Sequence, residues 1–142
     1  MRAPLNVLVI YAALSHPLRV AVEDHLRAFE RAGHRCFYVN LMVRRPPRWL
    51  AKVDFDLIVF HTTFLGQRWV PRHFAKLRRR ARALAAIDAP RVALPQDEFL
   101  RSDSVAEFVE EAGVDVVCSV APPAAWPVIY PTLDSSRVQL RQ

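Results

Sequence analysis

The chain has 142 residues, of which 52% are hydrophobic and 24% are charged. These values are typical of one folded globular domain, and they exclude both a pair of independent domains and an intrinsically disordered chain. No apolar run approaches the roughly 18 to 20 residues that a membrane-spanning helix requires, which predicts a soluble chain. The net charge of +6 comes from 20 basic and 14 acidic residues. Such an excess permits an anionic partner without requiring one.

Hydrophobic periodicity predicts an alternation of strands and helices along the whole chain. Short runs of apolar and β-branched residues predict strands over residues 5–11, 36–39, 56–61, 91–94, 114–120 and 137–140. Apolar residues at helical spacing predict helices over residues 18–33, 71–87, 102–113 and 122–129. In the third of these helices, Ser102 to Ser104 is expected to cap the first turn. Residues 44–48 are basic and contain two prolines, which excludes regular helix or sheet there.

This alternation predicts the fold class. Strands of four to seven apolar residues that are separated by helices favour parallel pairing with right-handed crossovers. We therefore expect residues 1–142 to form a single α/β domain of three layers, with a doubly wound, Rossmann-like parallel sheet of about six strands.

Several cofactor and metal motifs are absent from the sequence. Cys36 and Cys118 are its two cysteines and form no CxxC pair, so neither a disulfide scaffold nor a zinc site is indicated. The five histidines have no metal-ligand spacing, and the loop after the first strand lacks the glycines of a dinucleotide fingerprint. We therefore expect neither a metal ion nor a bound cofactor.

In an open parallel sheet, ligands bind outside the carboxyl ends of the strands, which selects the candidate site residues. Those that directly follow a predicted strand are Ser15, His16, His61, Thr62, Gln96, Asp97 and Glu98. Residues 54–56 precede a strand, so their Asp-x-Asp pattern is expected to lie at the opposite edge as a solvated strand entry.

His16, His61 and Asp97 are the candidate catalytic residues among these. A histidine has a pKa close to that of a general base at neutral pH, so His16 or His61 could accept a proton from a hydroxyl group. The alternative is that both imidazoles only hydrogen-bond loop backbone. Asp97 and Glu98 could orient a hydroxyl or hold a histidine, whereas the alternative is that they cap the loop or pair with an arginine. His25 and His34 are expected to be structural.

One segment carries a strong charge asymmetry. Residues 57–87 contain no acidic residue. The basic residues expected to form a cationic helix face are Arg68, Arg72, Lys76, Arg78, Arg79, Arg80 and Arg82. Such a face suits a phosphate-rich or anionic membrane surface, and the alternative is a solvated helix face without a partner. Aromatic residues do not form a stacking platform, so we expect no specific nucleic-acid binding.

Four segments resemble one known family, the amino-terminal halves of bacterial glycosyltransferases with two Rossmann-like domains (the GT-B fold). They are residues 6–11 (NVLVIY), 54–61 (DFDLIVFH), 92–99 (VALPQDEF) and 113–117 (GVDVV). The similarity extends over nearly the whole chain. The first loop departs from members of the family with a glycine-rich first loop, which argues against direct contact of this domain with a diphosphate.

The resemblance implies transfer of a sugar from a nucleotide-sugar donor to a polysaccharide or lipid-linked acceptor, at the cytoplasmic face of the inner membrane. In that family the amino-terminal domain shapes the acceptor side of an interdomain cleft, and a carboxyl-terminal domain holds most of the donor. By position, His16 would face the donor phosphate and the acceptor, and His61 and residues 96–98 would line the same cleft. We therefore expect a fragment of a longer enzyme that is inactive by itself. The alternative is a non-catalytic module that binds anionic partners through the face formed by residues 68–82.

Overall fold

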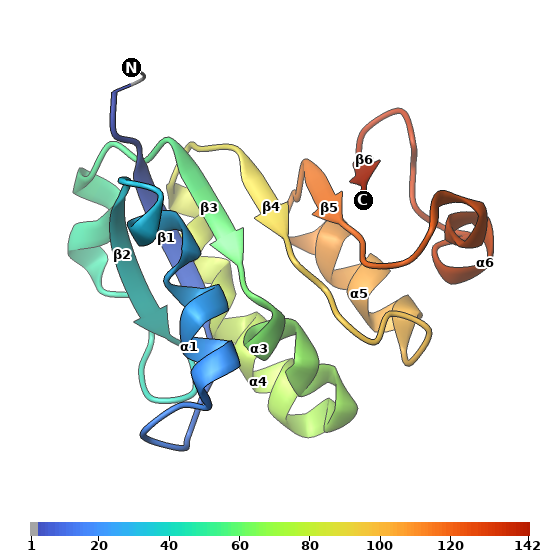
Figure 1. Cartoon of the computed structure of the whole chain (residues 1–142), viewed down its shortest axis with the longest axis horizontal. Coiled ribbons are helices and arrows are strands. Elements are labelled where there is room, and N and C mark those ends of the chain that lie inside the picture. The colour runs from blue at the N-terminus through green and yellow to red at the C-terminus, as the bar shows by residue number, and fades with distance from the viewer. Residues whose placement is uncertain (1–2) are drawn as a thin grey trace.

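The computed structural model describes residues 3–142 and contains one six-stranded, fully parallel sheet (Figure 1). The strands lie in the order β2-β1-β3-β4-β5-β6. Their bounds are β1 (Asn6–Tyr11), β2 (Arg35–Asn40), β3 (Leu57–Phe60), β4 (Arg91–Ala93), β5 (Val116–Cys118) and β6 (Gln139–Arg141). The chain winds from β1 outward to β2, returns to β3 on the other side of β1, and then continues in one direction. This order confirms the doubly wound, Rossmann-like α/β fold and places the reversal of strand order between β1 and β3.

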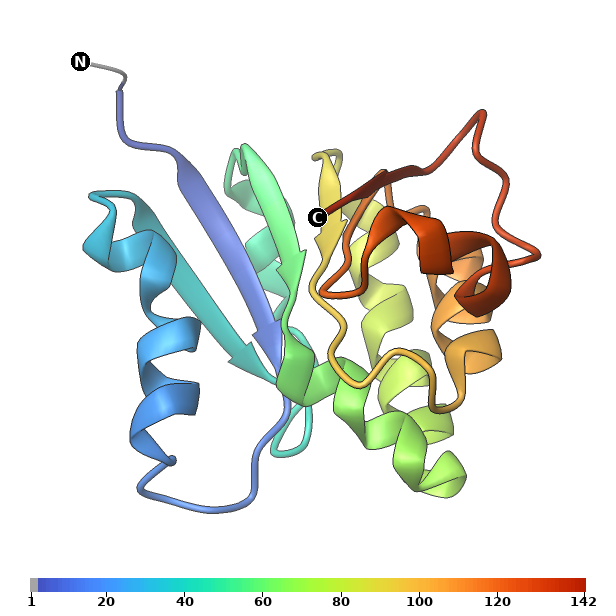
Figure 2. The same cartoon turned by 45° about the vertical axis from the view of Figure 1, so that its right-hand side comes forward.

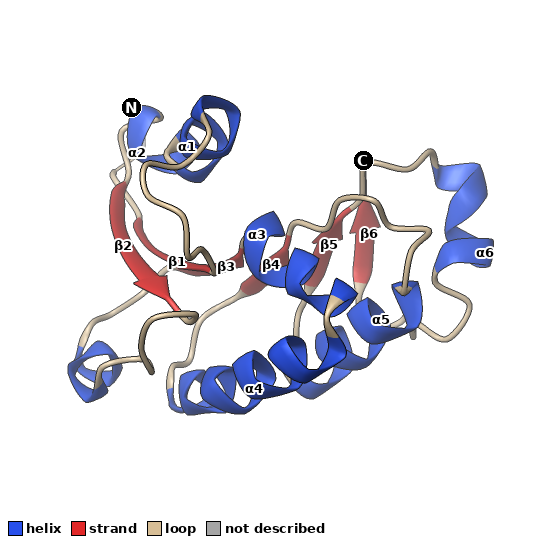
Figure 3. Ribbon diagram, turned by 90° about the horizontal axis from the view of Figure 1, so that it is seen from below, coloured by secondary structure: helices blue, strands red, loops and turns tan. Residues whose placement is uncertain are grey.

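Helices cover both faces of the sheet and make it the middle of three layers. Viewed along the sheet, α1 (Val20–Leu26) and α2 (Ala28–Arg31) lie on one face, and α4 (Pro71–Ala81) and α5 (Ser102–Glu111) lie on the other (Figure 3). The short α3 (Thr62–Leu65) follows β3, and α6 (Trp126–Ile129) lies beyond the β6 edge. The 3-10 helices are η1 (Arg48–Lys52), η2 (Gly66–Trp69), η3 (Arg82–Ala86) and η4 (Pro123–Ala125).

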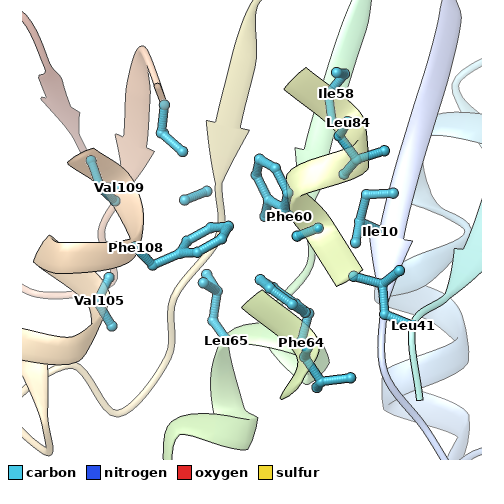
Figure 4. Close-up of a cluster of buried hydrophobic side chains, with 14 of the residues drawn as sticks. Ile10, Leu41, Ile58, Phe60, Phe64, Leu65, Leu84, Val105, Phe108 and Val109 are labelled. Atoms are coloured by element: carbon cyan, nitrogen blue, oxygen red, sulfur yellow. The ribbon is translucent and has the colours of Figure 1, made fainter. Parts of the chain in front are cut away.

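The larger core lies between the sheet and the layer of α4 and α5, and aromatic rings fill its centre (Figure 4). The ring of Phe108 meets Phe60 edge-on at 4.9 Å between centroids and Phe64 at 5.0 Å. Phe74 completes the group at 5.7 Å from Phe64. These rings come from β3, α3, α4 and α5, so their burial fixes α3 and α4 relative to the central strand.

The predicted helix over residues 71–87 is shorter in the structure, because α4 ends at Ala81 and continues as the 3-10 turn η3. The side chain of Arg91 holds the turn that follows. Its guanidinium donates to the carbonyl oxygens of Leu84 (2.9 Å) and Ile87 (3.0 Å), and also to that of Ala112 at the end of α5 (2.6 Å). A basic side chain from β4 thus supplies hydrogen-bond donors to carbonyl groups at the ends of helical segments.

Two other local expectations differ from the structure. The predicted helix over residues 18–33 is divided into α1 and α2 by Arg27. The capping role expected for Ser102–Ser104 is wrong, because Arg101 occupies the N-cap of α5 with left-handed backbone (φ 50°) and no side chain caps the helix. At the amino edge, by contrast, Asp56 accepts the backbone N–H of Asn6 at 2.8 Å, as a strand-entry role requires.

Within residues 3–142, no helix combines the length and hydropathy that crossing a bilayer would demand.

Candidate functional site

An open cavity of about 670 Å³ lies at the carboxyl edge of the sheet, beside the point where strand order reverses. The loop after β1 forms one wall together with the start of α1. The region after β3, from α3 through η2 to the first turn of α4, forms the other wall. Both regions lie at the same end of the sheet (Figure 2). The two loops diverge because β1 connects outward to β2 while β3 connects toward β4, and doubly wound sheets bind ligands at this position. The cavity volume lies within the range of small-molecule sites.

The lining of this cavity combines an apolar floor with a few polar side chains. The apolar lining residues are Ala12, Ala13, Leu14, Leu18, Val22 and Met42. The polar side chains are Ser15, Arg19, Thr63, Gln67 and His73. Sequence reasoning selected only Ser15 from this set. Thr63 also directly follows the third predicted strand, but Thr62 was selected there instead. Arg19 was missed because it lies eight residues after the end of β1, and Gln67 and His73 because they follow β3 by more than six residues.

The loop after β1 carries Ser15 and His16, and both side chains are exposed. The Asn40 side chain at the end of β2 holds this loop, since its Nδ2 donates to the carbonyl of Ala13 at 2.7 Å and its Oδ1 accepts the Ala13 N–H at 3.1 Å. His16 lines a neighbouring hollow of about 240 Å³ between the loop and the end of β2. Ser15 borders both spaces.

The structure corrects the expected position of His61, which is 1% exposed and lies beneath the cavity wall rather than in the crevice. Its Nδ1 accepts the backbone N–H of Thr63 at 3.2 Å and lies 3.0 Å from the Thr63 hydroxyl. Its Nε2 lies 2.8 Å from Nδ1 of His25 on α1. Because Nδ1 accepts, the proton of a neutral His61 resides on Nε2 and is donated to His25.

Burial, and secondly the proximity of His25, lower the pKa of His61 to about 4, so the imidazole is neutral at physiological pH. Both ring nitrogens are engaged, which removes His61 as a free proton acceptor. Its contacts instead tie α1 to the end of β3, with the two imidazole rings 4.9 Å apart. No sequence signal joins His25 to His61, because their contact depends on how α1 crosses the sheet.

The loop after β4 presents Gln96 and Asp97 to solvent, and neither side chain lines the 670 Å³ cavity. Thr62 begins α3 and is half-buried, also outside the cavity lining. The structure therefore places the predicted residues along one edge of the sheet, but it does not bring Asp97 into the cavity that Ser15 lines. Asp97 has left-handed backbone with φ of 50°, a conformation that asparagine and aspartate tolerate better than most residues.

Glu98 is 1% exposed, which corrects its expected place among the substrate-binding residues. Its Oε1 accepts the N–H of Val120 at 2.6 Å and the hydroxyl of Ser119 at 3.0 Å. Its Oε2 accepts the hydroxyl of Tyr130. Burial and this bond raise the pKa of Tyr130 well above its usual range. Glu98 therefore fastens the loop after β4 to the loop after β5, and its oxygens are already engaged by protein groups.

Arg68 corrects a third expectation, because it is 1% exposed and lies in η2 rather than on a cationic surface. Its guanidinium donates only to backbone carbonyl oxygens. They belong to Leu65 (3.0 Å), Gln96 (2.8 Å), Asp97 (2.9 Å) and Leu100 (2.9 Å). Burial lowers the pKa of Arg68. The side chain thus links η2 to the loop after β4 and supplies hydrogen-bond donors to main-chain carbonyls that lie outside the sheet.

Three more residues of the predicted cationic face are engaged by protein groups. Arg78 pairs with Glu107 (3.2 Å) and Glu111 (2.7 Å), and Arg82 pairs with Glu111 (2.9 Å). Arg80 is half-buried and donates to backbone carbonyls that follow β2. These contacts hold α4 and η3 against α5 and the segment after β2. The remaining members, Arg72, Lys76 and Arg79, are exposed and make no ion pair within residues 3–142.

In the described part of the chain, no group of three or more His, Cys, Asp or Glu side chains is arranged to hold a metal ion. Comparison of the chain with family models, with curated proteins and with solved structures finds no match in any of the three.

Proposed function

We propose that this chain binds a sugar-containing ligand in the 670 Å³ cavity, as the acceptor-side domain of a glycosyltransferase. The observation that carries the proposal is the cavity's position at the reversal of strand order in a doubly wound sheet. On this proposal a nucleotide-sugar donor would be held mainly by a second domain, and the acceptor would be a polysaccharide or a lipid-linked glycan.

The lining supports a hydroxylated ligand with an apolar face. Ser15, Gln67 and Arg19 offer hydrogen-bond donors around alanine and valine surface, which suits a saccharide that presents hydroxyl groups at its rim and C–H groups on its ring face. Gln67 Nε2 lies 3.3 Å from the Thr63 carbonyl, so the amide oxygen of Gln67 is left to accept from a ligand.

A proton acceptor for the sugar-accepting hydroxyl would come from His73 rather than from His61. His73 is exposed on the first turn of α4, lines the cavity, and makes no side-chain hydrogen bond within residues 3–142. His16 is similarly unengaged but borders the smaller hollow. In this proposal His73, and not His61, accepts the proton. His61 instead positions the start of α3 in the cavity wall through its contact with Thr63.

The proposal is tested by ligand-detected NMR and calorimetry on the whole chain, with a panel of oligosaccharides and nucleotide sugars. The expected result is saturation transfer to saccharide protons. We expect His73→Ala and Arg19→Ala each to weaken binding about tenfold, which is the loss of one hydrogen bond. Two controls are matched in residue type: Arg31→Ala removes an exposed arginine of α2, and His16→Ala removes the imidazole of the smaller hollow.

Absence of saccharide binding, or equal loss of binding in the Arg31 control and the Arg19 variant, would refute the proposal. If only the His16 variant loses binding, the ligand binds in the 240 Å³ hollow, and the assignment of the larger cavity is refuted.

A further inference from the structure

The exposed side of α4 carries a row of cations that the structure leaves available to solvent. Arg72, Lys76 and Arg79 are spaced at i, i+4 and i+7, so they share one ridge of the helix. Phe74 and Leu77 are buried against the core on the opposite side. Among residues 3–142, none of the three cations has an ion-pair partner or a side-chain hydrogen bond. The ridge therefore presents three uncompensated charges.

The segment that follows β2 is anchored against the same helix. Arg80 on α4 donates to the carbonyl of Leu41 and to that of Met42 (3.1 Å), which fixes the start of the segment. Further along, a groove of about 170 Å³ is lined on one side by residues 46–48, 50 and 51 and on the other by residues 83, 84, 86 and 87. Both ends of the segment are therefore anchored beside α4 and η3. Three arginines of this segment are exposed: Arg44 and Arg45 lie between the two anchored parts, and Arg48 lies in the part that lines the groove.

We call the set formed by these two groups the basic face. Its members are Arg44, Arg45, Arg48, Arg72, Lys76 and Arg79. Residues 31–53 and 57–87 contain no aspartate or glutamate, so neither contributing segment supplies an internal counter-charge. The nearby carboxylates of α5, Glu107 and Glu111, are already paired with Arg78 and Arg82. A surface with this charge and no acidic residue of its own attracts an anionic partner.

Two exposed apolar side chains lie in the same segment as Arg44, Arg45 and Arg48, and they narrow the chemistry of the partner. Trp49 in η1 is 51% exposed, with its ring resting against Phe37 at 6.4 Å between centroids. Val43 is 67% exposed and directly precedes Arg44. Tryptophan is the side chain that favours the interface between lipid headgroups and acyl chains, and arginines around it would meet the phosphates. Duplex nucleic acid would offer phosphates but no apolar layer for these two side chains.

We propose that the basic face docks this chain onto the surface of an anionic phospholipid bilayer, with Trp49 and Val43 entering the headgroup layer. This inference does not depend on the proposed transferase function. His73 lines the 670 Å³ cavity and directly follows Arg72, so one end of the basic face meets the cavity rim. Docking would therefore hold the cavity close to the bilayer surface.

The test is co-sedimentation of the whole chain with vesicles of phosphatidylcholine alone or of phosphatidylcholine mixed with phosphatidylglycerol. We expect binding to the mixed vesicles only, with strong weakening between about 0.1 M and 0.5 M salt. The charge-reversal variant Arg44→Glu, Arg48→Glu and Arg79→Glu should lose binding at least a hundredfold. A matched control, Arg31→Glu, Arg137→Glu and Arg141→Glu, makes the same change in net charge at exposed positions of α2 and the β6 edge, outside the basic face.

Tryptophan fluorescence reports the apolar contact. Brominated lipid should quench the fluorescence of the wild-type chain, and Trp49→Phe should remove most of that quenching while binding remains measurable. Circular dichroism verifies that each variant is folded. The proposal is overturned if neutral vesicles bind equally well, if the two triple variants lose equal affinity, or if Trp49→Phe leaves the quenching unchanged. It is also overturned if a random-sequence DNA duplex binds the same face more tightly than the vesicles do.

Discussion

Replacing His61 by glutamine is expected to change how the free energy of unfolding depends on pH. The pKa of His61 is about 4 in the folded chain because burial and then His25 disfavour the charged form, against about 6.5 for an unfolded histidine. Below pH 6.5 the unfolded chain binds a proton at this position that the folded chain does not bind. Stability is therefore lost as pH falls from 6.5 toward 4, and the loss levels off below that.

The size of this loss follows from the two pKa values. The linkage relation gives about 2 kcal/mol between pH 7 and pH 5, and a limit of about 3 kcal/mol below pH 4. No reduction for solvent screening is needed, because the side chain is 1% exposed. His61→Gln removes the titrating group but leaves an amide that can still donate to His25. At pH 7 the variant should be less stable by about 1 to 3 kcal/mol, since the N–H of Thr63 loses its acceptor.

The assay is urea unfolding at pH 7, 6 and 5, followed by tryptophan fluorescence. Between pH 7 and pH 5 the wild-type chain should lose about 2 kcal/mol more than His61→Gln loses. His73→Gln, at an exposed histidine without a hydrogen-bond partner in residues 3–142, is the control and should follow the wild type. If wild type and His61→Gln lose the same stability over this range, the protonation argument for His61 is refuted.

Three further predictions concern the loops and glycines, and urea unfolding measures each of them. Arg68→Met should destabilise the chain by about 3 kcal/mol or more, because four carbonyl oxygens lose the Arg68 donor, although that of Asp97 keeps another, the Leu100 N–H; a loss below about 1 kcal/mol would contradict that role. Glu98→Gln should cost about 1 kcal/mol, since the amide retains the shape and one acceptor oxygen. Glu98→Ala should cost about 3 kcal/mol, because it leaves the Tyr130 hydroxyl and the Val120 N–H without their acceptor, whereas the Ala121 N–H keeps the Ser119 hydroxyl; equal costs would argue against the hydrogen-bond network. Gly113→Ala should destabilise the chain by about 1 kcal/mol, because the φ of Gly113 is 62°. Gly66→Ala should stabilise it by up to about 1 kcal/mol, because the φ of Gly66 is −62° and therefore helical. Neither added Cβ meets an atom within 4 Å, so a reversed order of the two stabilities would refute the conformational explanation.

The sheet and its layers could be predicted from the sequence because they depend on local apolar periodicity. Each of the six strands lies within or overlaps its predicted range, as β3 at Leu57–Phe60 does within residues 56–61. Parallel order followed from the alternation of short apolar runs with helices. The carboxyl-edge rule also selected Ser15, which lines the cavity at that edge.

The side-chain environments could not be predicted, because they are set by contacts between residues that are distant in sequence. Arg68 and the exposed Arg72 both lie in the run 57–87 that has no acidic residue, but three of the four acceptors of Arg68 lie 28 to 32 residues away in the loop after β4. His25 and His61 are 36 residues apart, and only the crossing of α1 over the sheet brings their rings together. Glu98 lies between exposed neighbours, yet its oxygens point inward to the loop after β5. Burial of a charged side chain therefore gives no signal in composition or spacing.

The anchoring of the loop after β4 has a consequence for how its sequence can change. Arg68 holds this loop through main-chain carbonyls, and only Glu98 among residues 96–101 uses its side chain for anchoring. Phe99 is 74% exposed on this fixed backbone. The course of the loop is thus largely independent of most of its own side chains, apart from the left-handed positions Asp97 and Arg101. Residues 96, 99 and 100 are therefore suitable for randomisation in a selection library that seeks new binding specificities on an unchanged scaffold.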